Sequence, residues 1–187
     1  RIVGGEYGGV ETPAAVHISR DNGKTWSQLF NTSTYSDRGA HIHLVAIDPY
    51  DPMTYYVNVG DNIAIKGLYV THNGGASWQK IMGMSSVYSP NALALLANGF
   101  LSCTFPDPYR VLFFADNYPA IFEYVKSSGE LRMIAQLPYE YNALKLYSAV
   151  LGQHGVTYFA GTDYGETPNI KSIWMTIDGS SYYRIGH

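Results

Sequence analysis

The chain repeats itself with a period close to 52 residues, and this period constrains its fold more than any other feature of the sequence. The segment Ser19–Trp26 (SRDNGKTW) returns as Thr71–Trp78 (THNGGASW). A separate segment, Asn91–Leu95, recurs 51 residues later as Asn142–Leu146. Two weaker copies of the first segment begin at Val125 and Thr176. A fixed period of this size indicates a chain built from copies of one small structural unit.

Each period holds four short runs typical of β-strands, separated by turn-forming Pro, Gly, Asp and Asn residues. In the second period these runs are 42–47, 55–59, 67–71 and 77–81. No segment has apolar residues at helical spacing over three turns, and the best helical candidate, Asn91–Leu96, lies where the period requires an inner strand. The sequence therefore predicts an all-β fold, a β-propeller with four-stranded antiparallel blades.

The predicted strands number fifteen, or about 3.75 blades, because the first blade lacks its first strand. A single propeller region, 1–187, divides into a partial blade at 1–30 and blades at 40–82, 90–137 and 141–187. A propeller protects its sheet edges by closing a ring. We therefore interpret the chain as a fragment or as a propeller that another chain completes, with a compact four-bladed ring as the alternative.

Composition excludes several classes of function. A formal charge of −3 argues against a nucleic-acid binder, which needs a basic surface. No apolar run approaches the roughly 20 residues of a membrane span. Phosphate-binding glycine loops, dinucleotide fingerprints and paired cysteines are absent, so the sequence predicts no cofactor.

The pattern Ser19-x-Asp21-x-Gly23-x-Thr25-Trp26 resembles the Asp-box, or BNR repeat, of sialidases, xyloglucan-degrading glycoside hydrolases, sortilin-type receptors and photosystem assembly propellers. In those families the motif is architectural. Its acid or amide accepts backbone N–H bonds across a turn, its Gly permits positive φ, and its Trp packs between neighbouring sheets. We expect this structural role here for the four motif residues Asp21, Asn73, Trp26 and Trp78.

The segments Ala46-Ile47-Asp48-Pro49 and Gly67-Leu68-Tyr69-Val70-Thr71 resemble the xyloglucanase and photosystem assembly-factor branches most. Thr162-Asp163-Tyr164-Gly165 is similar to the segment that carries a catalytic Asp in xyloglucanases. The resemblance implies a carbohydrate-active propeller, with Asp163 as a candidate catalytic residue.

Candidate site residues gather on one predicted face. Alternating strand directions place the loops after the second strand of each blade, and those before the first strand, on the same face. Acidic residues follow each second strand: Glu6, Asp61, Asp116 and Asp163. The neighbouring rim adds Tyr7, His41, His43, Tyr118 and Tyr164 as ligand-binding candidates.

Glycoside hydrolysis needs two carboxyl groups across a groove, one acting as acid and the other as base or nucleophile. We favour Glu6 or Asp61 paired with Asp163 as catalytic residues, with Asp116 as a further candidate. The alternative is that these residues form turns, where Asp and Asn are common. His41 and His43 share one face of a strand, and we expect a rim pair, with no metal site.

The sequence thus predicts a secreted, extracellular, glycoside hydrolase-like propeller with a glycan or polysaccharide ligand. The alternative is a non-catalytic recognition or scaffold propeller, such as a receptor, an assembly factor or a viral adhesion component. In either case a partner chain is a candidate for completing the ring. The resemblance leaves open whether the chain is an enzyme.

Overall fold

The computed structural model describes residues 1–7, 13–32, 40–60, 65–81, 101–115, 120–136, 145–163, 170–178 and 181–186. These residues form two compact units, Arg1–Ile81 and Met82–His187. Their only helical element is the short 3-10 turn η2 (Gln153–Gly155). None of the described helical residues could cross a membrane, because a span needs a much longer apolar helix.

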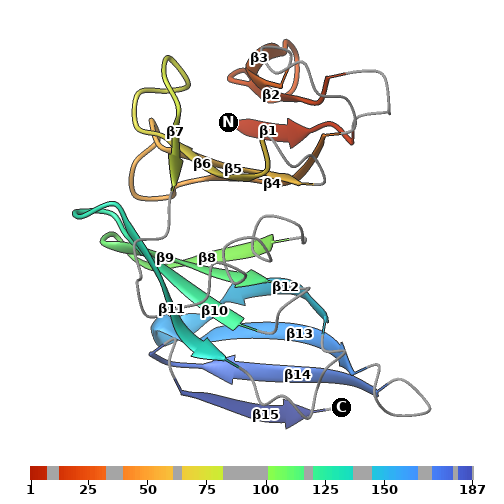
Figure 1. Cartoon of the computed structure of the whole chain (residues 1–187), viewed down its shortest axis with the longest axis vertical. Helices are drawn as coiled ribbons and strands as arrows, with labels where there is room; N and C mark the ends of the chain where they lie inside the picture. Colours follow the sequence, from red (N-terminus) through yellow and green to blue (C-terminus); the bar gives the residue numbers. More distant parts are fainter. Residues whose placement is uncertain are drawn as a thin grey trace. The chain divides into compact units, whose positions relative to one another are not determined.

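The first unit contains two antiparallel sheets, which we call the first and second sheets (Figure 1). Their strands, in the order in which they pair, are β1 (Ile2–Gly5), β2 (Ala15–Ser19) and β3 (Ser27–Asn31), then β4 (His41–Ile47), β5 (Tyr55–Gly60), β6 (Gly67–Thr71) and β7 (Gln79–Ile81). Each strand pairs with its neighbour in sequence, as in a propeller blade.

The second unit contains two four-stranded sheets, which we call the third and fourth sheets. The third sheet consists of β8 (Leu101–Asp107), β9 (Arg110–Ala115), β10 (Ala120–Val125) and β11 (Glu130–Gln136). The fourth sheet consists of β12 (Lys145–Leu151), β13 (Thr157–Asp163), β14 (Ile170–Thr176) and β15 (Tyr182–Gly186). The described residues thus form the predicted partial propeller of one three-stranded and three four-stranded sheets.

The third sheet differs from expectation in its inner strand. The recurrence of Asn91–Leu95 at Asn142–Leu146 predicted this strand at Asn91–Leu96, a segment that lies outside the described residues. The strand that pairs with β9 is β8, Leu101–Asp107, later in the chain. The connection from β7 to β8 is longer than the one from β11 to β12, so the sequence period is not constant across these connections.

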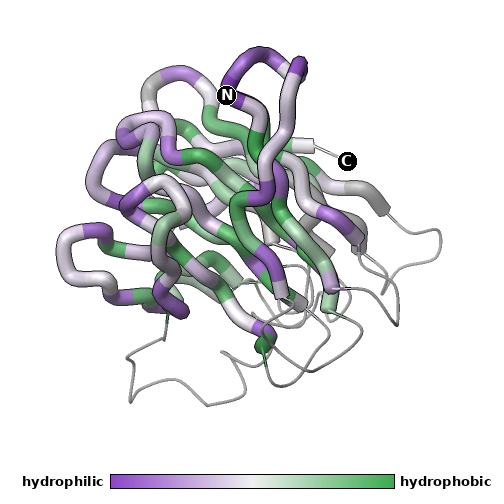
Figure 2. The backbone as a smooth tube through the Cα atoms, turned by 90° about the horizontal axis from the view of Figure 1, so that it is seen from above, coloured by the Kyte–Doolittle hydropathy of each residue, from purple (hydrophilic) through white to green (hydrophobic). Residues whose placement is uncertain are grey.

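Each unit is stabilised by apolar side chains packed between its two sheets. In the first unit, Val16 and Phe30 of the first sheet belong to one buried cluster with Val57, Val59 and Tyr69 of the second. The second unit has an equivalent cluster of Leu112, Phe114, Ile121, Phe159 and Trp174. Hydrophobic residues follow the strands and hydrophilic ones gather at many of the turns (Figure 2). Sheet-on-sheet burial is therefore the main stabilising contact within each unit.

The turn after β2 is held by the side chain of Asp21. Its Oδ1 accepts the Thr25 backbone N–H at 2.8 Å and its Oδ2 accepts the Thr25 hydroxyl at 2.6 Å. The Ser19 hydroxyl donates to Asp21 at 2.8 Å and accepts the Gly23 N–H at 2.7 Å. Gly23 has a φ of 87°, which glycine adopts without strain. The expected structural role of Asp21 is confirmed.

The equivalent turns repeat this arrangement with different groups. Asn73 accepts the Ser77 N–H at 2.9 Å, and Thr71 accepts the Gly75 N–H at 3.0 Å. After β14, Asp178 accepts the Ser181 N–H at 2.7 Å, three residues on rather than four. After β10, the Gly129 N–H donates to the Val125 carbonyl at 2.9 Å. The expected role of Asn73 is confirmed. The two weaker copies of the motif, which begin at Val125 and Thr176, also have a hydrogen bond across the turn.

The two motif tryptophans differ in their surroundings. Trp78 packs edge-on against Phe30 of the neighbouring sheet, with ring centroids 5.0 Å apart. Trp26 is 49% exposed, and its indole N–H donates to the Gly23 carbonyl at 3.2 Å. Packing between sheets is therefore confirmed for Trp78, whereas Trp26 covers its own turn.

Asp21→Asn should lower the thermal unfolding midpoint near neutral pH, by an amount that shrinks in acid. Hydrogen bonds from the Thr25 hydroxyl and N–H and from Ser19 lower the Asp21 pKa from 3.8 to about 2. A carboxylate with a depressed folded-state pKa stabilises the fold fully above its unfolded pKa, and this stabilisation is lost as the pH falls through the folded value.

Thermal unfolding followed by circular dichroism between about pH 6 and pH 2 checks this prediction. Asn73→Ala is the matched control, because its amide does not titrate and its effect should stay nearly constant. A difference between Asp21→Asn and the wild type that does not change across this pH range would contradict the prediction.

Candidate functional site

Four of the predicted site residues lie together in the first unit: Glu6, Tyr7, His41 and His43. Asp163 ends β13 in the second unit, where its backbone is described. The other candidates, Asp61, Asp116, Tyr118 and Tyr164, lie outside the described residues. The pairing of Glu6 or Asp61 with Asp163 therefore stays a prediction.

Glu6 follows β1 and is held at both its backbone and its side chain. Its N–H donates to the Ala15 carbonyl at 2.8 Å, and its own carbonyl accepts the Ile42 N–H at 3.2 Å. The carboxylate Oε2 accepts the Ala15 N–H at 3.1 Å. Oε1 lies 2.7 Å from His17 Nε2. These contacts fix the carboxylate at the end of the β1–β2 hairpin and beside the start of β4.

His17, the partner of Glu6, was not among the predicted site residues. The glutamate side chain is 50% exposed and the imidazole 35%, so both are accessible to a solute. Glu6 lies opposite Ala15 in the hairpin, and His17 lies two residues further along the same face of β2. Diagonal neighbours across antiparallel strands are within reach of long side chains. The sequence could therefore have predicted the contact between Glu6 and His17, but only with the register of β1 against β2 known.

Tyr7 stacks on His41, the first residue of β4. The ring centroids are 3.8 Å apart and the planes differ by 19°. The tyrosine is 68% exposed, so this stack presents an accessible planar surface. The Ile42 N–H that binds the Glu6 carbonyl brings the two strands together at this point. The predicted proximity of the loop after β1 and the start of β4 is thus observed within the first unit.

His43 occupies a β-bulge, which alters the predicted arrangement of the two histidines. Ile42 pairs with Val59 and Leu44 with Asn58, leaving His43 as the extra residue. A similar register shift lies between Leu146 and Ser148 in β12, so the feature recurs in the fourth sheet. Bulges bend a strand and redirect the side chain at that point. The ring centroids of His41 and His43 are 6.1 Å apart.

Gly60 provides the space that the His43 ring occupies. A Cβ added at Gly60 would overlap the imidazole of His43. The glycine therefore permits a close approach between the end of β5 and the bulge in β4. Among the described residues, no group of three or more His, Cys, Asp or Glu side chains is arranged to hold a metal ion.

The arrangement combines a carboxylate–imidazole pair with an accessible aromatic–imidazole stack. The Glu6–His17 pair can exchange hydrogen bonds with hydroxyl groups, since it offers both donors and acceptors. The Tyr7 ring can cover an apolar ring face of a ligand. Together these groups can hydrogen-bond to and stack against a hydroxyl-rich ligand.

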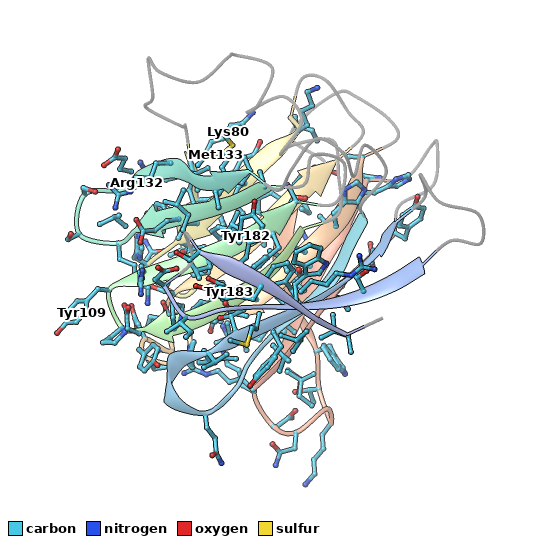
Figure 3. The ribbon with its side chains drawn as sticks, turned by 90° about the horizontal axis from the view of Figure 1, so that it is seen from below. Lys80, Tyr109, Arg132, Met133, Tyr182 and Tyr183 are labelled. Atoms are coloured by element: carbon cyan, nitrogen blue, oxygen red, sulfur yellow. The ribbon has the colours of Figure 1, made fainter. Side chains whose placement is uncertain are left out.

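A second charged cluster, which the sequence did not predict, lies in the third sheet. Glu123 has a side chain only 7% exposed, and it accepts hydrogen bonds from Arg110 at 3.2 Å and from Arg132 at 2.8 Å. Figure 3 labels Arg132, which pairs with Glu123 across β10 and β11. The Glu123 carboxylate raises the Arg132 pKa by hydrogen bonding and charge attraction.

Arg110 extends this cluster toward the fourth sheet. It donates to Asp107 Oδ2 at 2.7 Å and to the Asp178 carbonyl at 3.4 Å. Burial acts to lower the Arg110 pKa, but the bonds to Asp107 and Glu123 outweigh it and raise the value. Every carboxylate in the cluster has a cationic partner, so we assign it a structural role.

Comparison with known proteins gives two curated relatives with the same activity in their names. The chain is 27% identical over 129 residues to the oligoxyloglucan-reducing end-specific xyloglucanase of Emericella nidulans, a match that covers 69% of this chain and 15% of that protein. It is 33% identical over 80 residues to a probable enzyme of the same name from Neosartorya fischeri, covering 43% of this chain and 9% of the relative. No sequence profile of a known protein family matches the chain.

Solved structures of similar fold include two family 74 glycoside hydrolases. The enzyme from Niastella koreensis matches 93% of this chain with a TM-score of 0.64 and 19% identity. The xyloglucanase from Xanthomonas campestris matches 93% with a TM-score of 0.64 and 18% identity. At this identity the likeness establishes the fold. The chain spans about a quarter of each structure, 26% and 27%. It therefore resembles the xyloglucanase branch of β-propellers over part of their length.

Gly60→Ala should displace the His43 ring, because the added Cβ would overlap it. Relieving an overlap of this kind costs about 1–3 kcal/mol of folding free energy. The imidazole resonances of His43, recorded by 15N NMR, should shift. Gly4→Ala is the control, since its Cβ would meet nothing within 4 Å. Identical His43 resonances in the two variants would show that the ring does not depend on Gly60.

Proposed function

We propose that this chain is part of a carbohydrate-active propeller that binds a xyloglucan-type polysaccharide. The observation that carries the proposal is the match, over two thirds of the chain, to a protein named as a xyloglucanase specific for oligoxyloglucan reducing ends. Both solved structures named above are family 74 glycoside hydrolases, which supports the same class of ligand. An extracellular location follows from the proposal, because such a polysaccharide occurs outside the cell.

The glycan would contact the first unit where β1 ends and β4 begins. The exposed ring of Tyr7, supported from behind by His41, offers a surface for one sugar face. Glu6 and His17 lie beside it and would bind sugar hydroxyls. His43, lodged over Gly60, would shape the adjacent rim.

In the catalytic form of this proposal, Glu6 or Asp61 works with Asp163, and Asp116 is a further candidate. One carboxyl group would protonate the departing sugar oxygen and the other would activate water or attack the anomeric carbon. Retaining enzymes hold the two groups about 5–5.5 Å apart, and inverting enzymes about 6.5–9.5 Å apart. The surroundings of Glu6, a fixed carboxylate that is half exposed, are compatible with either role.

A non-catalytic recognition or scaffold propeller, completed by another chain, is the second candidate. The contacts of Glu6 favour it, because both carboxylate oxygens are engaged within its own hairpin. A carboxylate used in this way can stabilise the hairpin without taking part in a reaction. The two proposals share the glycan-binding surface and differ in whether a bond is broken.

Tyr7→Ala should weaken binding of xyloglucan oligosaccharides about tenfold, since an aromatic stacking contact contributes roughly 0.5–1.5 kcal/mol beyond its buried area. Isothermal titration calorimetry measures this change. Tyr50→Ala is the matched control: this residue is also exposed, at 49% against 68% for Tyr7, but it follows the opposite end of β4. Equal affinity in the Tyr7 variant and the wild type would remove Tyr7 from the binding surface.

Four variants test the candidate carboxylates: Glu6→Gln, Asp61→Asn, Asp116→Asn and Asp163→Asn. The two that remove the catalytic pair should each reduce hydrolysis of xyloglucan by about 10²–10⁴-fold, the usual contribution of acid–base catalysis. Asp178→Asn is the control, because Asp178 follows the end of β14 opposite to the one that pairs with Asp163. Release of reducing ends is the measurement. A wild-type chain that binds the oligosaccharide without releasing reducing ends would favour the recognition proposal.

A further inference from the structure

One short motif of the sequence belongs neither to the repeated turns nor to the candidate site. Asn31-Thr32-Ser33 has the form Asn-x-Ser with x other than Pro, which is the acceptor motif for N-linked glycosylation in secreted proteins. None of the other nine asparagines of the chain is followed two residues later by Ser or Thr. The sequence therefore offers a single position for this modification.

Asn31 is the last residue of β3, the outer strand of the first sheet (Figure 1). Among the described residues, β3 pairs with β2 on one side and with no strand on the other. The fourth strands of the other sheets, β7, β11 and β15, also lie at a sheet edge. The edge position is therefore a property of the blade. Because β11 ends at Gln136 and β15 at Gly186, the repeat does not require Asn at this place.

The register of β3 directs the Asn31 side chain away from the core of the first unit. Asn31 pairs with Ala15, and the preceding residue, Phe30, pairs with Val16. Phe30 and Val16 belong to the buried cluster between the two sheets, and successive residues of a strand project to opposite faces. Asn31 is accordingly only partly buried. A group attached to its amide would not have to enter this core.

Thr32, the middle residue of the motif, holds the end of the β2–β3 hairpin. Its N–H donates to the Ala14 carbonyl at 3.0 Å, and its hydroxyl accepts the Ala14 N–H at 3.0 Å. Thr32 is only 1% exposed. Since these bonds involve Thr32 and Ala14, a modification of the Asn31 amide leaves them in place.

We propose that Asn31 is an N-glycosylation site, which receives an oligosaccharide when the chain passes through a eukaryotic secretory pathway. A bond forms between Asn31 Nδ2 and the anomeric carbon of the first sugar. The bond from that carbon to the diphosphate of a lipid-linked oligosaccharide donor breaks, the lipid diphosphate leaves, and the amide loses one proton. A bulky hydrophilic group at this edge would also hinder pairing of β3 with strands of other chains.

This inference rests on the extracellular location that follows from the proposed function. Its test does not depend on xyloglucan binding. A glycosylated chain that binds no xyloglucan oligosaccharide would contradict the proposed function alone. An unmodified chain that binds the oligosaccharide would overturn the assignment of Asn31 alone.

Secretion of the 187-residue chain from yeast, behind a cleavable signal peptide, tests the proposal. Mass spectrometry should give a mass above 20.7 kDa, and digestion with peptide N-glycosidase should return it to that value. Digestion in 18O-labelled water converts a glycosylated asparagine to labelled aspartate, which peptide mapping should place at Asn31. Circular dichroism should show the same strand signal before and after digestion, because the glycan lies outside the core.

Asn31→Gln and Ser33→Ala should both lose the glycan completely, although Ser33→Ala leaves the acceptor Asn31 unchanged. Ser33→Thr is the matched control, because it keeps the hydroxyl group of the motif and should keep the glycan. Wild-type chains of 20.7 kDa, both secreted and retained in the cell, would overturn the proposal. So would added mass that survives peptide N-glycosidase or persists in both variants, or a strand signal that is present only after the glycan is removed.

Discussion

Contact between the apolar faces of adjacent sheets is the constraint on which the rest of each unit depends. Val16 and Phe30 meet Val57 and Tyr69 in the first unit, as Phe114 meets Phe159 in the second. This packing decides which residues of a strand face inward. It therefore leaves the strand ends and turns as the positions where polar groups such as Glu6 can remain accessible to a ligand.

The candidate site follows from this arrangement, because two sheets of one unit bring a strand end and a strand start together. The Glu6 carbonyl accepts the Ile42 N–H, and the stack of Tyr7 on His41 lies next to that bond. The bulge at His43 and the missing side chain at Gly60 adjust the same rim. The polar groups of the rim are thus positioned by backbone contacts between the end of β1, β4 and β5.

Much of the fold could be predicted from the repeat, and less of the site. The strand at Gly67–Thr71 matches its predicted bounds, because turn residues mark both ends. The Glu6–His17 pair, the His43 bulge and the Glu123–Arg132 pair each depend on strand register, and periodicity does not fix register. The inner strand of the third sheet lies later in the chain than the repeat predicted, because the length of a connecting segment can change without altering the blade.

The closed turns after β2, β6 and β10 share one backbone donor, the glycine N–H four residues after the last strand position. Its acceptor is a serine hydroxyl at Gly23, a threonine hydroxyl at Gly75 and a main-chain carbonyl at Gly129. The repeats therefore share the orientation of one glycine N–H group, whereas the group that accepts its hydrogen bond differs from one repeat to the next. Substitutions can remove the motif residues of such a repeat while the turn keeps its hydrogen bond. A search for the sequence motif therefore undercounts the blades that a chain contains.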